Sequence, residues 1–170
     1  MKIISKTIIL AFLVLTAFQL SAQKFGYVNS AELLQMHPQI SEKNAELEAF
    51  QKKEAEQLQA AAESFETKYR KFEQDMQAGV LSQVQADKQR EALAAEQQEL
   101  QQKDQTAQFK VAQKREQLIQ PILKELDDAI QAVGKEGGFL FIFDTGASGS
   151  IIYAQETDDV TELIKSKLGW

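Results

Sequence analysis

The stretch from Leu58 to Ser82, LQAAAESFETKYRKFEQDMQAGVLS, decides the fold class of this chain. Gly79 and Ser82, near its end, are residue types that stop one helix and cap the start of the next. Before Gly79, apolar residues recur at steps of four and three, the spacing of a coiled-coil seam: Leu58, Ala62, Phe65, Tyr69, Phe72 and Met76. The stretch therefore predicts a helix, a tight turn near residues 77–82 and a second helix.

The segments on the two sides of this turn are similar in length and composition. Between Gln39 and Lys114 there is no proline and no glycine except Gly79, and residues that favour helices fill the segment. In the second half the seam alternates apolar with polar residues: Leu93, Leu100 and Ala107 recur every seven residues, and Gln97 and Asp104 stand between them. We expect a mainly α-helical protein in which residues 39–118 form a long antiparallel coiled-coil hairpin.

The first 22 residues have the pattern of a secretory signal peptide. Lys2 and Lys6 precede an apolar run from Ile8 to Phe18, and the small residues Ser21 and Ala22 lie near its end. We expect export, with cleavage near Ala22; the alternative is an uncleaved anchor. The chain has no cysteine, which excludes disulfides and a lipid-anchored N-terminus.

The charge of the chain restricts its partners. It has 19 Lys and Arg against 25 Asp and Glu, and loss of Lys2 and Lys6 with the leader would change the net charge from −6 to −8. An acidic chain lacks the basic face that nucleic acids require, so we expect no nucleic-acid partner. The same charge argues against contact with anionic membranes or lipopolysaccharide.

The two ends of the mature chain predict a small β-rich body made of residues 23–38 and 119–170. Phe25, Tyr27 and Val28 indicate a strand, and Asn29 with Glu32 resembles a capping box for a helix from Ser30 to Met36. The later part of the body contains four predicted elements: the strand Phe139–Phe143, buried on both faces; a glycine-rich turn over 144–149; a strand over 150–154; and a helix from near Asp158 to Gly169.

So small a body predicts an oligomer. About sixty residues without a disulfide make a marginal core, and a three-stranded sheet leaves its edges open. Strand pairing between chains would relieve both problems. The residues expected to carry this oligomerisation are Phe25, Tyr27, Phe139, Phe141, Phe143, Ile151 and Tyr153.

One short motif in the sequence resembles a catalytic signature. Asp144-Thr145-Gly146 followed by Ala147-Ser148 matches the signature of aspartic proteases, which use two aspartates. Here the string occurs once, and the 22 residues from Gly149 to Trp170 are too few for the rest of such a cleft. His37 is the only histidine and has no cluster of metal ligands around it. We therefore predict no enzyme, no catalytic residue, no metal and no cofactor.

The aromatic stripe of the first helix offers a different function. A thin two-helix seam cannot cover large side chains completely, so some apolar surface should stay accessible to other proteins. We expect weak client contacts at Phe65, Tyr69, Phe72, Met76, Val80 and Leu81.

The order of these parts resembles the Skp/OmpH family of periplasmic chaperones. The resemblance rests on Lys24-Phe25-Gly26-Tyr27-Val28-Asn29-Ser30, the helical hairpin, Phe139–Asp144, Ile151–Ala154 and Asp159-Val160-Thr161, and it covers nearly all of the mature chain. It implies a jellyfish-like homotrimer with a small β-barrel body and helical arms around a cavity. It also implies a periplasmic holdase that keeps unfolded outer-membrane proteins from aggregating without ATP. Well-known members are basic, whereas this chain is acidic.

A structural role is the alternative. An exported hairpin can also serve as a coiled-coil scaffold or as part of an efflux adaptor without chaperone activity. Adaptors, however, carry further domains on both sides of the hairpin, and the 170 residues of this chain leave too little length for them.

Overall fold

The computed structural model describes residues 23–148 and 151–170, so the predicted signal peptide lies outside the described part of the chain. The described residues divide into two compact units. The hairpin unit is Met36–Lys124, and the body unit combines the residues up to Gln35 with Glu125–Trp170. No helix within the described ranges is long and apolar enough to cross a bilayer.

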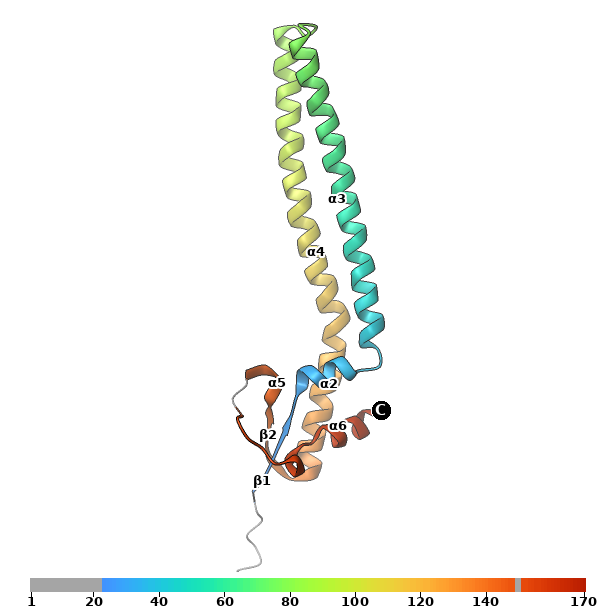
Figure 1. Cartoon of the computed structure of the whole chain (residues 1–170), viewed down its shortest axis with the longest axis vertical. Coiled ribbons are helices and arrows are strands. Elements are labelled where there is room, and N and C mark those ends of the chain that lie inside the picture. The colour runs from blue at the N-terminus through green and yellow to red at the C-terminus, as the bar shows by residue number, and fades with distance from the viewer. Residues whose placement is uncertain (1–22, 149–150) are drawn as a thin grey trace, which may run out of the picture. The chain divides into compact units, whose positions relative to one another are not determined.

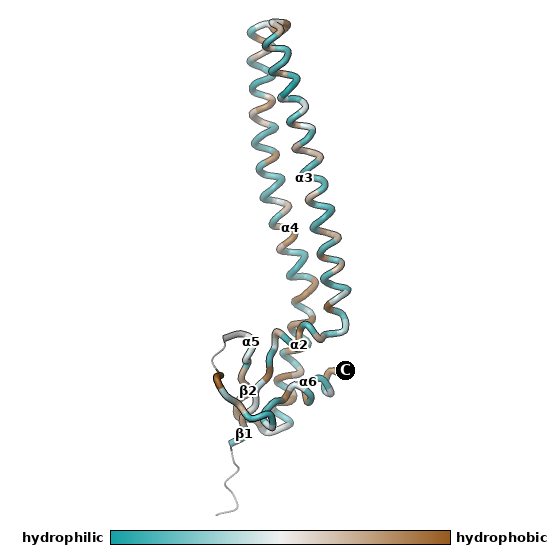
Figure 2. Tube along the Cα trace, in the orientation of Figure 1, coloured by the Kyte–Doolittle hydropathy of each residue, from teal (hydrophilic) through white to brown (hydrophobic). Residues whose placement is uncertain are grey.

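The hairpin unit contains two long helices that run antiparallel, α3 (Ile40–Gln77) and the part of α4 (Gln83–Gly137) that precedes Glu125 (Figure 1). Polar residues cover most of both helices, and apolar residues appear only at intervals along them (Figure 2). No residue of α3 is fully buried. The hairpin thus has a narrow seam instead of a core, as expected for two amphipathic helices with no third layer.

The turn of the hairpin lies where the sequence predicts it. Gly79 has φ of 66°, a left-handed conformation in which glycine is favoured. Ser82 and Gln85 then form a reciprocal cap at the start of α4: the Gln85 amide N–H donates to Ser82 Oγ at 3.4 Å, and the Ser82 amide N–H donates to Gln85 Oε1 at 3.0 Å. This capping box satisfies backbone donors that the first turn of a helix leaves without partners.

Helix α4 extends further than the sequence predicts. It passes through Pro121 and ends only at Gly137, so the predicted boundary at residue 118 is not a helix end. Proline removes one backbone hydrogen bond, but Leu126, Ala129 and Val133 follow it at steps of three and four and are all buried. Burial of this stripe offsets the cost of the proline. Gly138, with φ of 67°, then terminates the helix.

The body unit contains one small parallel sheet. Strand β1 (Lys24–Val28) pairs with β2 (Phe139–Asp144) in a register that places Phe25 beside Phe141 and Tyr27 beside Phe143. Four short helices complete the unit: α2 (Ser30–Met36), α5 (Thr145–Ser148), the 3₁₀ helix η1 (Glu156–Asp158) and α6 (Thr161–Leu168).

The core of the body unit joins its helices to one face of the sheet. The fully buried side chains are Val28, Leu33, Val160 and Ile164, and Leu126, Ala129 and Val133 of α4 are nearly so. Gly26 allows the close approach of Val160 to β1, because a Cβ at residue 26 would lie 2.8 Å from Val160 Cγ1. Ile142 of β2 packs near Gly134 of α4 on the same side. One face of the sheet is therefore covered.

Three predictions for the body are wrong. Residues 151–154, the described part of the strand predicted over 150–154, form no strand, and the sheet of the described residues has two strands. Strand β2 is not buried on both faces: Leu140, Phe141 and Phe143 are exposed. The turn expected over 144–149 contains α5. The missing strand and the open face of β2 have related causes. A strand needs another strand to pair with, and an apolar sheet face needs a second layer to cover it, and the described residues of one chain provide neither.

Candidate functional site

Asp144 has a structural role in the body unit. Its carboxylate accepts hydrogen bonds from the amide N–H of Ser30 at 3.1 Å, from Ser30 Oγ at 2.5 Å and from the amide N–H of Gly146 at 2.9 Å. Thr145 Oγ1 donates to the Val28 carbonyl at 3.2 Å. The string that resembles a protease signature thus ties the end of β2 to the start of α2. Asn29 also caps α2, as the sequence predicts, by accepting from the Glu32 amide at 3.1 Å.

Three phenylalanines form an exposed cluster on the uncovered face of the sheet, which we call the phenylalanine face. The rings of Phe25 and Phe141 are stacked, with centroids 6.1 Å apart and 4° between their planes. Phe143 completes the cluster at 6.4 Å from Phe25 and 6.1 Å from Phe141. These side chains are 42%, 56% and 46% exposed, so about half of this aromatic surface is in contact with solvent and could be buried against a partner.

The other predicted oligomerisation residues lie near the sheet or in the segment after it. Phe139 is half-buried, with Lys24 Nζ 4.1 Å from its ring centroid. Tyr27 is half-buried, and partial desolvation together with Asp159 raises the pKa of its phenol. Ile151 is half-buried and Tyr153 is exposed; the sequence analysis missed Ile152, which is 99% exposed.

Ion pairs link α3 to α4 at three levels of the hairpin. Lys114 meets Glu46 at 2.6 Å, Lys110 meets Glu54 at 3.2 Å and Lys68 meets Glu96 at 2.6 Å. The hydrogen bond from Lys114 holds the pKa of Glu46 below its ordinary value. These pairs are consistent with the antiparallel register, to which partly exposed ion pairs add little stability each. Glu96 is half-buried and Gln97 exposed, so the seam position assigned to Gln97 is wrong, whereas Asp104 is half-buried as expected.

The predicted client-contact residues lie toward the turn of the hairpin. Tyr69, Met76 and Val80 are exposed by 45%, 41% and 65%. Phe65, Phe72 and Leu81 are half-buried, and the rings of Phe65 and Tyr69 lie 6.2 Å apart. Further exposed apolar residues of the hairpin unit, which the sequence did not indicate as client contacts, include Val84 and Phe109; neither falls on the seam spacing.

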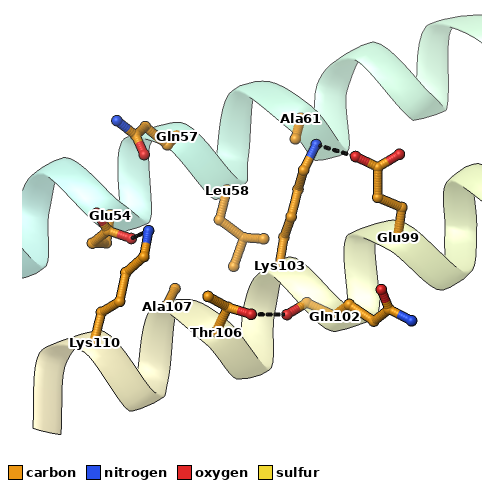
Figure 3. Close-up of a pocket in the computed structure, with 10 residues that line it drawn as sticks. All are labelled: Glu54, Gln57, Leu58, Ala61, Glu99, Gln102, Lys103, Thr106, Ala107 and Lys110. Carbon is orange, nitrogen blue, oxygen red and sulfur yellow. Dashed lines mark hydrogen bonds and ion pairs between the residues drawn. The ribbon is translucent and has the colours of Figure 1, made fainter. Parts of the chain in front are cut away.

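Two grooves flank Leu58 in the middle of the hairpin. The first has a volume of about 470 Å³; Leu58 projects between the helices, with Lys110 paired to Glu54 on one side and Lys103 paired to Glu99 on the other (Figure 3). The second has a volume of about 410 Å³ and is lined by Leu58, Ala62, Leu100, Gln101, Asp104 and Gln105. Small seam residues leave this space unfilled.

His37 and the acidic residues provide no metal site within the described ranges. His37 is buried, and its Nδ1 accepts a hydrogen bond from the Gln39 amide at 3.2 Å, just before α3 begins. No group of three or more potential ligands in the described residues is arranged to hold a metal ion.

Comparison with known proteins points to one family. Residues 24–168 match the family model described as outer membrane protein (OmpH-like). The fold is similar to the crystal structure of an OmpH-like protein from Caulobacter crescentus CB15, whose proposed role is that of an outer membrane chaperone. The TM-score is 0.71 at 16% sequence identity, over 87% of this chain and 85% of that one. Comparison with curated proteins gives no match.

Proposed function

The chain belongs to the OmpH-like outer membrane protein family, and from this premise we propose that it is an ATP-independent holdase of the periplasm. Its clients are unfolded outer-membrane proteins, which it binds between helical arms and keeps from aggregating. The predicted leader, residues 1–22, supports export, and the family supports a role as a chaperone without enzymatic activity.

The observation that carries this proposal is the accessible apolar surface of the hairpin. Tyr69, Met76, Val80, Val84 and Phe109 are each exposed by 41–68%, along two helices that otherwise present polar residues. Each contact is weak, because a half-exposed side chain contributes only part of the roughly 1.5–3 kcal/mol of full burial. Several weak contacts at once raise the effective concentration of a client without a specific pocket.

The proposal includes assembly through the body unit. The phenylalanine face and the exposed segment from Ile151 to Tyr153 present apolar surface that a single chain leaves uncovered. We propose that copies of the chain cover this surface in one another and extend the two-stranded sheet into a closed, barrel-like body. By the resemblance to the Skp/OmpH family, the assembly is a homotrimer.

Light scattering tests the proposed function. An unfolded outer-membrane β-barrel protein is diluted from denaturant with and without the mature chain, in the absence of ATP. We expect the mature chain to suppress scattering at a stoichiometry of about one assembly per client. A coiled-coil scaffold without chaperone activity would leave scattering unchanged, and this result would reject the holdase.

A further inference from the structure

The two grooves beside Leu58 differ in how their charges are paired. In the first groove each lysine already has a carboxylate partner: Lys110 with Glu54 at 3.2 Å, and Lys103 with Glu99 at 2.9 Å. In the second groove Asp104 is the one charged residue of the lining. Its Oδ2 accepts a hydrogen bond from Gln108 Nε2 at 3.0 Å, but no cation among the described residues pairs with it. We call this second groove the Asp104 groove.

The apolar part of the Asp104 groove suits an aliphatic chain. Leu58 and Ala62 of α3 and Leu100 of α4 line a space of about 410 Å³, which is large enough for a long side chain. Gln101 and Gln105 add amide oxygens that can accept further hydrogen bonds. An apolar wall with one half-buried carboxylate complements a side chain that has an aliphatic stem and a cationic head.

The charge around the groove favours the same ligand. Residues 53–66 and 94–107 contain seven carboxylates against two cations, Lys53 and Lys103. The rest of the hairpin unit has more cations than carboxylates, since the whole unit carries 13 Lys and Arg against 15 Asp and Glu. Five of these seven carboxylates already pair with a lysine or arginine, four of them with a cation just outside the two ranges. Asp104 and Glu63 are the two without an ion pair among the described residues, so their negative charge is the part of this band that can attract a cationic ligand.

We propose that the Asp104 groove binds an arginine or lysine side chain of an unfolded client, with the stem against Leu58 and Leu100 and the cationic head on the Asp104 carboxylate. This inference rests on the proposed function and specifies its substrate class: extended segments that carry basic residues. A guanidinium fits especially well, because its several N–H groups can reach Asp104 and a neighbouring glutamine oxygen together.

Fluorescence anisotropy with the mature chain tests this proposal. The probe is a labelled glycine-serine peptide with three arginines, and the reference is the same peptide with glutamine in place of arginine. The test variant is Asp104→Asn, which keeps an acceptor for Gln108. The matched control is Glu63→Gln, which removes one charge from the same acidic band at a residue that does not line the groove.

We expect the arginine peptide to bind more tightly than the glutamine peptide, and Asp104→Asn to weaken it by about three- to tenfold, as for a partly exposed charge-assisted hydrogen bond. Glu63→Gln should change binding by less than twofold or so, as an exposed charge does. The methyl NMR signals of Leu58 and Leu100 should shift on addition of the arginine peptide and not of the glutamine peptide.

Equal loss of binding in the two variants, or unshifted Leu58 and Leu100 methyl signals, would show only diffuse attraction and would overturn the proposal. The scattering assay separates this failure from failure of the holdase. If the wild type protects clients but Asp104→Asn binds the arginine peptide as Glu63→Gln does, only the proposal for the groove is rejected. If the wild type protects no client but binds the arginine peptide with the expected pattern, the holdase function is rejected and the proposal for the groove is retained.

Discussion

The hairpin unit and the body unit are held together by different forces. In the hairpin unit α3 has no buried residue, and ion pairs such as Glu46–Lys114 and Glu54–Lys110 join the helices. In the body unit Leu33 and Ile164 have no exposed surface at all, yet the phenylalanine face is open. The hairpin therefore exposes its apolar groups in small, scattered pieces, whereas the body exposes them in one cluster.

This difference supports our proposal that the two units have different kinds of partner. A contiguous aromatic cluster favours a permanent, well-packed contact, as between subunits. Scattered half-exposed groups favour weak contacts with many sequences. The charges of the two units differ as well: the body unit has 4 Lys and Arg against 10 Asp and Glu, and the hairpin unit is closer to balance, with 13 against 15. Because like charges repel, contact between copies of the body would have to rely on its apolar surface.

The largest effect should come from a charge on the phenylalanine face. Phe141→Asp would place a carboxylate where a neighbouring copy is expected to bury an aromatic ring, and such burial is strongly unfavourable. We expect the variant to sediment as a monomer in analytical ultracentrifugation, while Tyr69→Asp on the hairpin keeps the wild-type assembly. An unchanged assembly for Phe141→Asp, or a monomeric wild type, would contradict the proposed role of this face.

The second effect concerns the length of the hairpin. Deletion of residues 54–67 together with 97–110 removes two heptads from each helix and leaves the pairs Glu46–Lys114 and Lys68–Glu96 in register. The shortened chain should assemble normally, because its body unit is intact. Its capacity to suppress aggregation of an unfolded outer-membrane protein should fall, because the deletion removes Phe65, Phe109 and both grooves beside Leu58, so that fewer weak contacts act together.

The control for this deletion is a single substitution at an exposed apolar residue, Val84→Ala, which should leave the capacity nearly unchanged. If the shortened protein assembled and still protected clients as well as the wild type does, the middle of the hairpin would have no part in holding, and the holding surface would lie near the turn or in the body unit.

Much of the fold can be predicted from the sequence where the signal is local. The seam spacing from Leu58 to Met76 and the pair Gly79 and Ser82 locate the first helix and the turn, since both depend on residues close in sequence. Pro121 misleads, because its local cost is offset by the buried side chains of Leu126 and Val133. The strand expected over 150–154 is wrong for its described residues, 151–154, for the opposite reason: a strand forms only when it pairs with another, and these residues pair with neither β1 nor β2.

The candidate site is less predictable than the fold. Asp104 stands out in the sequence as a polar residue on the seam, but nothing local shows that it lines a groove without a cation. Glu96 takes the seam position assigned to Gln97, and it pairs there with Lys68 of α3. Such pairings depend on the register of two helices, which the spacing within one helix does not determine.

The third effect compares the two units by the same kind of substitution. Ile164→Ala in the body core should lower the free energy of unfolding by about 2–5 kcal/mol, since it removes a fully buried side chain and leaves a cavity. Leu58→Ala in the hairpin should cost less, about 1–2 kcal/mol, because Leu58 is half-buried and already borders two grooves. Urea denaturation followed by circular dichroism measures both; equal costs would mean that the hairpin seam is as well packed as the body core.

The smallest effect is the response of the hairpin to acid. The hydrogen bond from Lys114 lowers the pKa of Glu46 in the folded state below its ordinary value of 4.5. A carboxyl group with a lowered folded pKa stabilises the fold at pH values above its unfolded pKa, and this contribution is lost as the pH falls through the folded pKa. Glu46→Gln should therefore lower the urea midpoint of the hairpin slightly at neutral pH and make it less sensitive to acid below about pH 4.5.

The matched control is Glu48→Gln. This substitution removes the same charge two residues away, at a glutamate that has no ion-pair partner among the described residues. The same acid dependence in Glu46→Gln as in Glu48→Gln would show that the pair with Lys114 adds no stability, and that packing of the seam alone holds the register.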